Sequence, residues 1–335
     1  MAPNFDNQTK RMPLKLEDFE ILDPIGTGSF SNVYHAIHKN SGRHVALKKI
    51  FWNISPDRIV SEVKFMKTLN RTDNHENIVK ILGLFRDFDQ STVVMDYIPH
   101  VPFRTFLPTV TGLQIKQYMF GMIEALCFVH SHKIIHRDVK PANFLFNPAT
   151  GKGCLIDFGL CEFDLHLDSN NIVIPIGDDA NDYDLMNPEK CQNRPRMIAS
   201  RAGTRGFRAP EVLFAAFNQT PKIDVWSAGV IFLSMITQRY PFFKSPDDFT
   251  SIIEIAGIVG TEKLKEAAHE CGRRVSFPKD IQGHNLKTLC FQLNLFIDEL
   301  NLDDSAFDLL EKMLEPIPSK RYRADQCLQH PFFAP

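Results

Sequence analysis

The sequence lacks the features that would place it in a membrane, outside the cell or on a nucleic acid. Its longest apolar run, Val225–Ile236, is too short for a transmembrane helix, which needs about 20 apolar residues. Residues 1–15 have no apolar signal core, so we expect no secretory peptide. A Lys/Arg cluster typical of nuclear import is missing, and the formal net charge is only −2. We therefore expect no membrane contact and no direct binding of nucleic acid.

Cysteine pairs and repeats are also missing from the sequence. The seven cysteines show neither close pairing nor the spacing of a zinc site, which favours reduced thiols in an intracellular protein. No internal repeat or low-complexity tract is present. With 335 residues, 44% of them hydrophobic, the chain can build one catalytic unit with little left over, so two additional domains do not fit.

Residues 136–143, which read His-Arg-Asp-Val-Lys-Pro-Ala-Asn, are the most informative part of the chain. An Asp-Phe-Gly motif follows, and its Asp157 lies 14 residues after Asn143. This order resembles the catalytic loop and the magnesium-binding motif of protein kinases. The resemblance implies ATP and Mg²⁺ as cofactors, because phosphoryl transfer depends on holding metal-chelated ATP against a hydroxyl and neutralising the charge that develops.

Five side chains receive catalytic or metal-binding roles from this resemblance. Asp138 would orient the substrate hydroxyl and accept its proton, and Lys140 would contact the transferred γ-phosphate. Asn143 and Asp157 would bind the magnesium ions. Thr204 would hydrogen-bond to Asp138 and Lys140 as part of the catalytic group. A lysine at position 140 is similar to the pattern of serine/threonine kinases, which predicts serine or threonine as the acceptor.

A glycine-rich hairpin is expected near the beginning of the chain. Gly26–Val33 follows an apolar stretch and precedes residues that alternate as a strand does. Such a match is weak when isolated, since most glycines of this kind are turn residues, and Ser31 replaces the third glycine. In a kinase the hairpin would cover the phosphates, with Met95 as gatekeeper and the backbones of Asp96 and Ile98 contacting adenine. The residues expected to contact ATP are Ile25, Gly26, Thr27, Gly28, Ser29, Phe30, Ser31, Val33, Ala46, Lys48, Met95, Asp96, Ile98 and Leu145.

A catalytic ion pair is expected between Lys48 and Glu62. Lys48 ends a Val-Ala-Leu-Lys run on a predicted strand, from which it would reach the α and β phosphates. A helix is predicted over residues 56–70, since Ser55 can cap it and a proline follows at the first helical position. Glu62 lies on that helix and would hold the ammonium of Lys48. Taken singly, each of the two could be a solvated surface charge, and the kinase order of the motifs favours the pair.

The motif order predicts an α+β, bilobal protein kinase fold with a small β-rich N-lobe and a larger helical C-lobe. Residues 1–18 would form a tail, 19–95 the N-lobe and 96–335 the C-lobe. Because 49 residues separate the Asp-Phe-Gly and Ala-Pro-Glu motifs, we place an insertion at about 163–196. Its acidic cluster lacks the glycine and the terminal glutamate of a calcium loop, so we expect no metal site there.

Three segments narrow the family. Residues 201–213 read RAGTRGFRAPEVL, residues 224–234 read DVWSAGVIFLS, and residues 239–248 begin with RYPFFK. They closely resemble the cell division cycle seven-type kinases, the catalytic subunits of the kinase that fires replication origins, and Ser31 also occurs in that family. The resemblance runs from about residue 19 to residue 333. Two departures are Arg205, where the family commonly has proline, and the short insertion.

The resemblance also implies partners and a location. It implies a Dbf-four-type regulatory subunit that fixes the Glu62 helix, MCM helicase subunits as protein substrates, and action in the nucleus. The apolar segment Ile50–Ile54 gives physical support, because it is apolar enough to need a cover. The alternative is that Trp52 in this segment packs on its own lobe.

Arginines near the expected peptide site predict the substrate preference. The candidate substrate-recognition residues lie within four positions of Thr204 in the sequence. They are Arg201, Arg205 and Arg208. Their guanidinium groups could pair with carboxylates or phosphoserine beside the target hydroxyl. We therefore expect acidic or pre-phosphorylated Ser/Thr sites. The alternative is that some of these arginines pair with the aspartates of the insertion or with Glu211.

Two other function classes remain to be weighed against a replication-initiating kinase. One is another acidophilic kinase, similar to the casein kinase two-like enzymes, which have a shorter activation segment. The other is a pseudokinase scaffold, which typically lacks one of the lysine, base or magnesium positions. All of these positions are filled in this chain, which favours an active enzyme.

Overall fold

The structure is a computed structural model that describes residues 14–28, 30–71, 75–164 and 202–334. These residues form two compact units. The first comprises the chain up to residue 74 together with Val79–Ile98, and the second comprises His75–Ile78 and the chain from Pro99 onward. The first unit ends at Ile98, close to the N-lobe boundary expected after residue 95. Most of the expected insertion at 163–196 lies outside the described residues.

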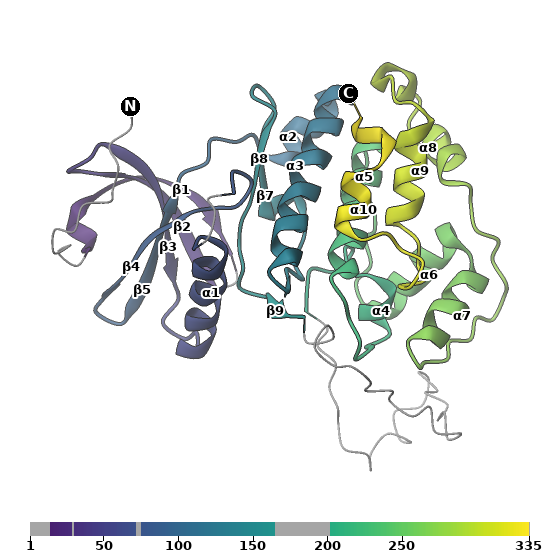
Figure 1. The fold of residues 1–335 in the computed structure, drawn as a ribbon, viewed down its shortest axis with the longest axis horizontal. Helices are drawn as coiled ribbons and strands as arrows, with labels where there is room; N and C mark the ends of the chain where they lie inside the picture. Colours follow the sequence, from purple (N-terminus) through teal and green to yellow (C-terminus); the bar gives the residue numbers. More distant parts are fainter. Residues whose placement is uncertain (1–13, 29, 72–74, 165–201, 335) are drawn as a thin grey trace, which may run out of the picture. The chain divides into compact units, whose positions relative to one another are not determined.

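The first unit is built on an antiparallel sheet of five strands in the order β1-β2-β3-β5-β4 (Figure 1). One face of the sheet buries an apolar cluster that includes Phe19, Leu47 and Phe85. Helix α1 begins at Pro56 and ends at Leu69, which confirms the predicted helix and its proline in the first turn. The strands are β1 (Phe19–Thr27), β2 (Ser31–His38), β3 (Arg43–Ile50), β4 (Ile81–Asp87) and β5 (Gln90–Asp96).

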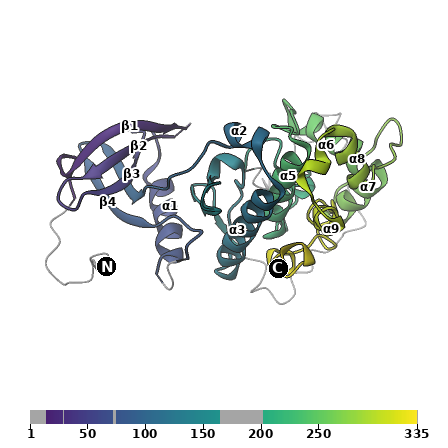
Figure 2. The same cartoon turned by 90° about the horizontal axis from the view of Figure 1, so that it is seen from above.

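The second unit is mainly helical and is organised around α3 (Gly112–Ser131) and α5 (Lys222–Thr237), which lie next to each other in Figures 1 and 2. A capping box begins α3, since Thr111 accepts from the Gln114 N–H and Gln114 accepts from the Thr111 N–H. Every residue of α5 from its second position onward is buried, so its apolar run is a core helix. Among the described residues, no helix combines the length and the apolar character needed to cross a bilayer.

In the described part of the second unit, seven further helices accompany α3 and α5. They are α2 (Phe103–Phe106), α4 (Pro210–Leu213), α6 (Asp248–Val259), α7 (Thr261–Glu270), α8 (Leu286–Leu293), α9 (Asp304–Met313) and α10 (Ala324–Leu328). Two small antiparallel sheets flank the catalytic loop. Their strands are β6 (Ile134–Ile135) with β9 (Glu162–Phe163), and β7 (Phe144–Asn147) with β8 (Lys152–Leu155).

The described cysteines are reduced thiols in the interior or at its edge. Cys154, Cys161, Cys290 and Cys327 are buried, and Cys127 and Cys271 are half-buried. Burial raises the pKa of the Cys127, Cys271 and Cys290 thiols to about 12. These groups are therefore protonated at neutral pH, as expected of structural thiols.

Candidate active site

A buried carboxylate of α5 fixes the start of the catalytic loop. Asp224 Oδ2 accepts from the backbone N–H of His136 at 2.8 Å, and Oδ1 accepts from that of Arg137 at 2.8 Å. The ring Nε2 of His130 lies 2.9 Å from Oδ2. Burial alone would raise the pKa of Asp224, but the hydrogen bond and charge of His130, together with His136, outweigh it, so the pKa is lowered. The loop therefore leaves β6 in an orientation that the core helix determines.

The carboxylate of Asp138 is held from both of its oxygens. Oδ1 accepts from the backbone N–H of Thr204 at 2.9 Å and from its hydroxyl at 2.7 Å. Oδ2 accepts from Lys140 Nζ at 2.7 Å and from Asn143 Nδ2 at 3.1 Å. Lys140 also donates to Thr204 Oγ1 at 2.9 Å. The hydrogen bonds expected between Thr204, Asp138 and Lys140 are thus present, and they hold a buried acceptor in one orientation.

Asn143 and Asp157 are oxygen ligands of the kind that a divalent cation prefers. Asn143 donates from Nδ2 to the Asp138 carbonyl at 2.8 Å, so its amide oxygen is the atom that would face a cation. Asp157 has a φ of 65°, in the left-handed region that is uncommon for non-glycine residues. The described residues contain no cluster of three or more His, Cys, Asp or Glu side chains that could hold a metal. A cation here would therefore take its other ligands from nucleotide phosphates and water.

The ion pair between β3 and α1 is present in the first unit. Lys48 Nζ lies 2.6 Å from Glu62 Oε1, and both side chains are largely buried. Lys48 stands opposite Val33 of β2 in the strand register. The pairing of β2 with β3 therefore places Lys48 beside the strand that follows the glycine-rich hairpin.

The expected nucleotide contacts of the first unit lie along β1, β2, β3 and β5. Gly26 stands opposite Val33 at the end of the β1–β2 hairpin, and Ala46 stands opposite Met95. Asp96 donates its backbone N–H to the Lys80 carbonyl at 3.1 Å, so an adenine contact through Asp96 would use its carbonyl oxygen. Ser29 lies outside the described residues, and Leu145 belongs to β7 of the second unit. The roles of these residues in ATP binding stay predictions.

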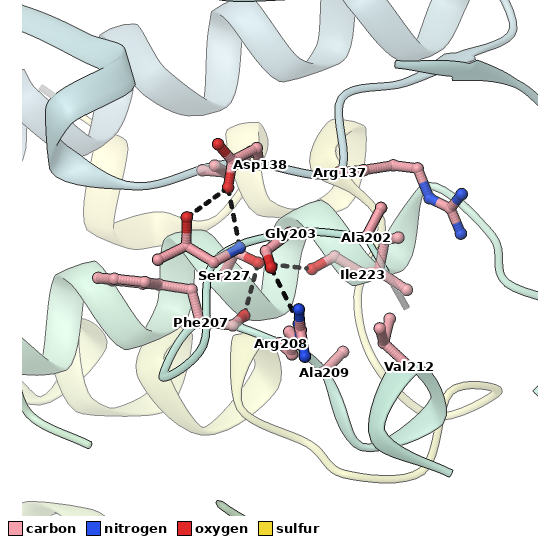
Figure 3. A pocket seen from close by; sticks show the side chains of 12 residues that line it. Arg137, Asp138, Ala202, Gly203, Phe207, Arg208, Ala209, Val212, Ile223 and Ser227 are labelled. Atoms are coloured by element: carbon pink, nitrogen blue, oxygen red, sulfur yellow. Dashed lines mark hydrogen bonds between the residues drawn. The ribbon is translucent and has the colours of Figure 1, made fainter. Parts of the chain in front are cut away.

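The arginines proposed for substrate recognition differ in their surroundings. Arg208 forms an ion pair with Asp248 at 2.7 Å. It also donates from Nε to the Gly203 carbonyl at 3.0 Å, as Figure 3 shows. Arg205 is exposed and donates to the Pro246 carbonyl at 2.5 Å. Arg201 lies outside the described residues. Arg208 therefore has an acidic partner within the chain, but that partner is Asp248, and Glu211 pairs with Arg321.

Sequence reasoning missed a role for Arg137, the neighbour of Asp138. Its side chain is buried, extends away from Asp138 in Figure 3, and pairs with Glu162 of β9 and with Gln219. Gly203 packs closely on its backbone, since a Cβ there would lie 2.5 Å from the Arg137 carbonyl oxygen. Arg137 thus joins the catalytic loop, β9 and the segment that carries Thr204. The adjacency of Arg137 to Asp138 was the available signal, but nothing in the sequence pointed to Glu162.

A buried ion pair closes the segment that follows Thr204. Arg321 donates from Nη1 to Glu211 Oε1 at 2.6 Å and from Nη2 to Oε2 at 2.9 Å. Both side chains are inaccessible to solvent or nearly so. The bidentate geometry fixes α4 against the chain near residue 321.

Comparisons with known proteins agree with this geometry. The model of the protein kinase domain matches residues 19–333. The chain is 38% identical to probable cell division control protein 7 homolog 1 of Encephalitozoon cuniculi, over 98% of this chain and 95% of the relative. It is 33% identical to the cell cycle protein kinase spo4 of Schizosaccharomyces pombe over 99% and 89%, and 25% identical to the human cell division cycle 7-related protein kinase over 94% and 89%. The chain is a serine/threonine protein kinase and belongs to the family of cell division cycle 7-related kinases.

Proposed function

We propose that this chain is the catalytic subunit of a kinase that initiates DNA replication in S phase. It transfers the γ-phosphate of Mg²⁺-bound ATP to Ser or Thr in acidic or pre-phosphorylated contexts, with MCM helicase subunits as targets. A Dbf-four-type subunit activates it, and it acts in the nucleus. The names of the relatives, which refer to cell division and the cell cycle, support this assignment. The arrangement of Asp138, Lys140 and Thr204 is the observation that carries the chemistry.

The reaction follows from the charge and orientation of the Asp138 group. The carboxylate accepts the proton of the substrate hydroxyl as the hydroxyl oxygen bonds to the γ-phosphorus. The bond from that phosphorus to the β–γ bridging oxygen breaks, and ADP leaves. Lys140 stands beside the carboxylate and stabilises the negative charge that spreads over the transferred group. Thr204 keeps the carboxylate turned toward the acceptor site, because it holds Oδ1 with two hydrogen bonds.

Asn143, Asp157 and Lys48 are the side chains proposed to hold the cofactor. Bound Mg²⁺ would neutralise phosphate charge, and Asn143 and Asp157 supply oxygen ligands for it. Lys48 would contact the α and β phosphates, and its pair with Glu62 keeps the ammonium from turning to solvent.

The preference for acidic sites rests mainly on Arg205. Its guanidinium is exposed close to Thr204, whereas Asp248 already neutralises that of Arg208. Arg205 donates to a neutral carbonyl, that of Pro246, so its positive charge is less neutralised than that of Arg208, which pairs with a carboxylate. We therefore propose that Arg205 contacts the substrate residue that follows the target serine or threonine.

Two exposed aromatic side chains support a protein activator on the first unit. Trp52 is 83% exposed and Phe88 is 95% exposed, so the alternative in which Trp52 packs on its own lobe does not describe this structure. Lys49 pairs with Thr92, and Gln90 Nε2 donates to the Ile50 carbonyl at 3.4 Å, so both aromatics lie at the same end of the sheet. Aromatic side chains are enriched at protein contacts, so two exposed aromatics at one end of the sheet favour a partner there.

Phosphate transfer to an acidic peptide from an MCM subunit tests the proposal. We would compare the wild type and Asp138→Asn, each with and without the activator. We expect the wild type to transfer phosphate only when the activator is present, and Asp138→Asn to be slower by at least about 100-fold.

Paired peptides with Asp or Lys after the target serine test the role of Arg205 in substrate preference. Arg205→Ala should reduce the preference for the Asp peptide about fivefold. Equal phosphorylation of both peptides by the wild type would exclude the acidic preference. Full activity without the activator would indicate a constitutively active acidophilic kinase.

A further inference from the structure

The tip of the glycine-rich hairpin is held by few contacts of its own. Gly28 donates its N–H to the Ser31 carbonyl at 2.9 Å, and the Phe30 carbonyl accepts from the Phe51 N–H at 2.9 Å. These bonds fix the backbone at Gly28, Phe30 and Ser31, but the Phe30 side chain remains 44% exposed. An aromatic ring at this position is not part of the apolar core, so its orientation depends on a neighbour outside the sheet.

That neighbour is Arg58 on the first turn of α1. Its guanidinium carbon lies 3.9 Å from the centroid of the Phe30 ring. A guanidinium over an aromatic face is attracted by the ring quadrupole, and the contact at a partly exposed site changes an equilibrium by a factor of about two to five. The Arg58 N–H donates to the Ser55 carbonyl at 3.1 Å, so the residue belongs to the rigid start of the helix.

The position of Arg58 on the helix links it to the catalytic ion pair. Arg58 and Glu62 are four residues apart, and such residues lie on the same face of a helix. One face of α1 therefore contacts the hairpin tip through Arg58 and the β3 lysine through Glu62. Both contacts reach elements that are expected to bind ATP phosphates. A shift of α1 away from the sheet would release both contacts together.

We infer that Arg58 is a positioning residue that holds the glycine-rich hairpin over the phosphates of a nucleoside triphosphate by means of Phe30. The inference rests on the proposed role of the hairpin in nucleotide binding. The position of α1 would then determine two contacts with the phosphates, one through Lys48 and one through the glycine-rich hairpin. Anything that fixes α1, including an activator subunit, then closes the hairpin as well as completing the ion pair.

Nucleotide binding by the full chain tests this inference without a protein substrate. We would measure the affinities for Mg²⁺-ATP and for AMP in the wild type, Arg58→Met, Phe30→Leu and the double variant. AMP lacks the β and γ phosphates, so a contact that acts through the hairpin should change ATP affinity alone. We expect Arg58→Met to weaken ATP binding about threefold with AMP binding unchanged. Arg58→Lys, which keeps a cation, should recover part of the loss.

The double variant and a matched control separate positioning from general stability. Phe30→Leu should weaken ATP binding by a similar factor, and the two changes together should cost no more than either alone. Lys67→Met removes an exposed cation from the same helix and should leave both affinities unchanged. Equal losses of ATP and AMP affinity, independent effects of the two changes, or unchanged ATP affinity in Arg58→Met would each overturn the inference. A wild type that binds no ATP would overturn the proposed nucleotide role as well.

Discussion

At the scale of single residues, Asp224 connects the core to the chemistry. It lies on α5, accepts the backbone hydrogen bonds that orient the catalytic loop, and is fully buried. Its carboxylate is stable in the interior because two N–H groups and His130 surround it. Loss of its charge would therefore affect both the stability of the fold and the position of Asp138.

Asp224→Asn should destabilise the protein and change its response to acid. An amide cannot accept equally from all of these donors, so we expect a loss of about 1–3 kcal/mol in the free energy of unfolding at pH 7. The folded pKa of Asp224 lies below the ordinary 3.8, so its contribution is complete above that value and is lost as pH falls through the lowered folded pKa. Urea unfolding between pH 7 and pH 2 would measure this. A wild type and variant with parallel stability curves below pH 4 would contradict the assignment.

At the scale of elements, the glycines of two helices have opposite surroundings. A Cβ on Gly229 in α5 would lie 3.0 Å from Met313 Cβ of α9 and 3.0 Å from Leu314 Cδ2. A Cβ on Gly257 in α6 would meet no atom within 4 Å. The glycine in α5 therefore allows two helices to approach, whereas the one in α6 has no such role.

Gly229→Ala and Gly257→Ala should change stability in opposite directions. Alanine favours the helical conformation over glycine by about 1 kcal/mol at both positions. We therefore expect Gly257→Ala to raise the free energy of unfolding by up to about that amount. At Gly229 the methyl group overpacks the contact with α9 at a cost of about 1–3 kcal/mol, which outweighs the gain. Thermal or urea unfolding of the two variants provides the comparison. The same gain in both would show that α9 moves aside without cost.

Local patterns explain what the sequence could predict at this scale. The helix at Pro56–Leu69 and the buried character of α5 depend on capping, proline placement and an apolar run, which neighbouring residues determine. The Lys48–Glu62 pair was predictable because the order of motifs is known for kinases. The contact of Arg137 with Glu162 depends on the pairing of β6 with β9, two strands of two residues each, whose alignment is set by tertiary packing. The exposure of Phe88 depends likewise on how the chain turns between β4 and β5.

At the scale of the whole molecule, the turn between β4 and β5 predicts a difference between the chain alone and the chain bound to the proposed activator. Asp87 pairs with Gln90, so Phe88 and Asp89 form a two-residue loop. Phe88 is in the left-handed region with a φ of 49°, at the loop position that favours glycine. An exposed aromatic side chain in that conformation costs the isolated chain free energy and gains it nothing by burial.

Phe88→Gly should therefore stabilise the isolated chain and weaken the complex. We expect a gain of about 0.5–1 kcal/mol in unfolding free energy, since glycine adopts this φ without strain. The activator should bind about tenfold more weakly, as expected when a central aromatic contact is removed. Trp52→Ser is the matched control, because it removes an exposed aromatic without relieving backbone strain, and it should lower affinity alone. Unchanged activator affinity in both variants would place the activator elsewhere.

The buried thiols have a consequence for how the molecule can be probed. An alkylating reagent attacks a thiolate, and Cys290 combines full burial with a pKa of about 12. Its modification at neutral pH therefore requires that the helical unit open first. Because Cys154 lies on β8 and Cys290 on α8, their labelling rates in one sample would record separate opening events in the two regions. The kinase thus carries native reporters of its own local unfolding, and no cysteine needs to be introduced by mutation.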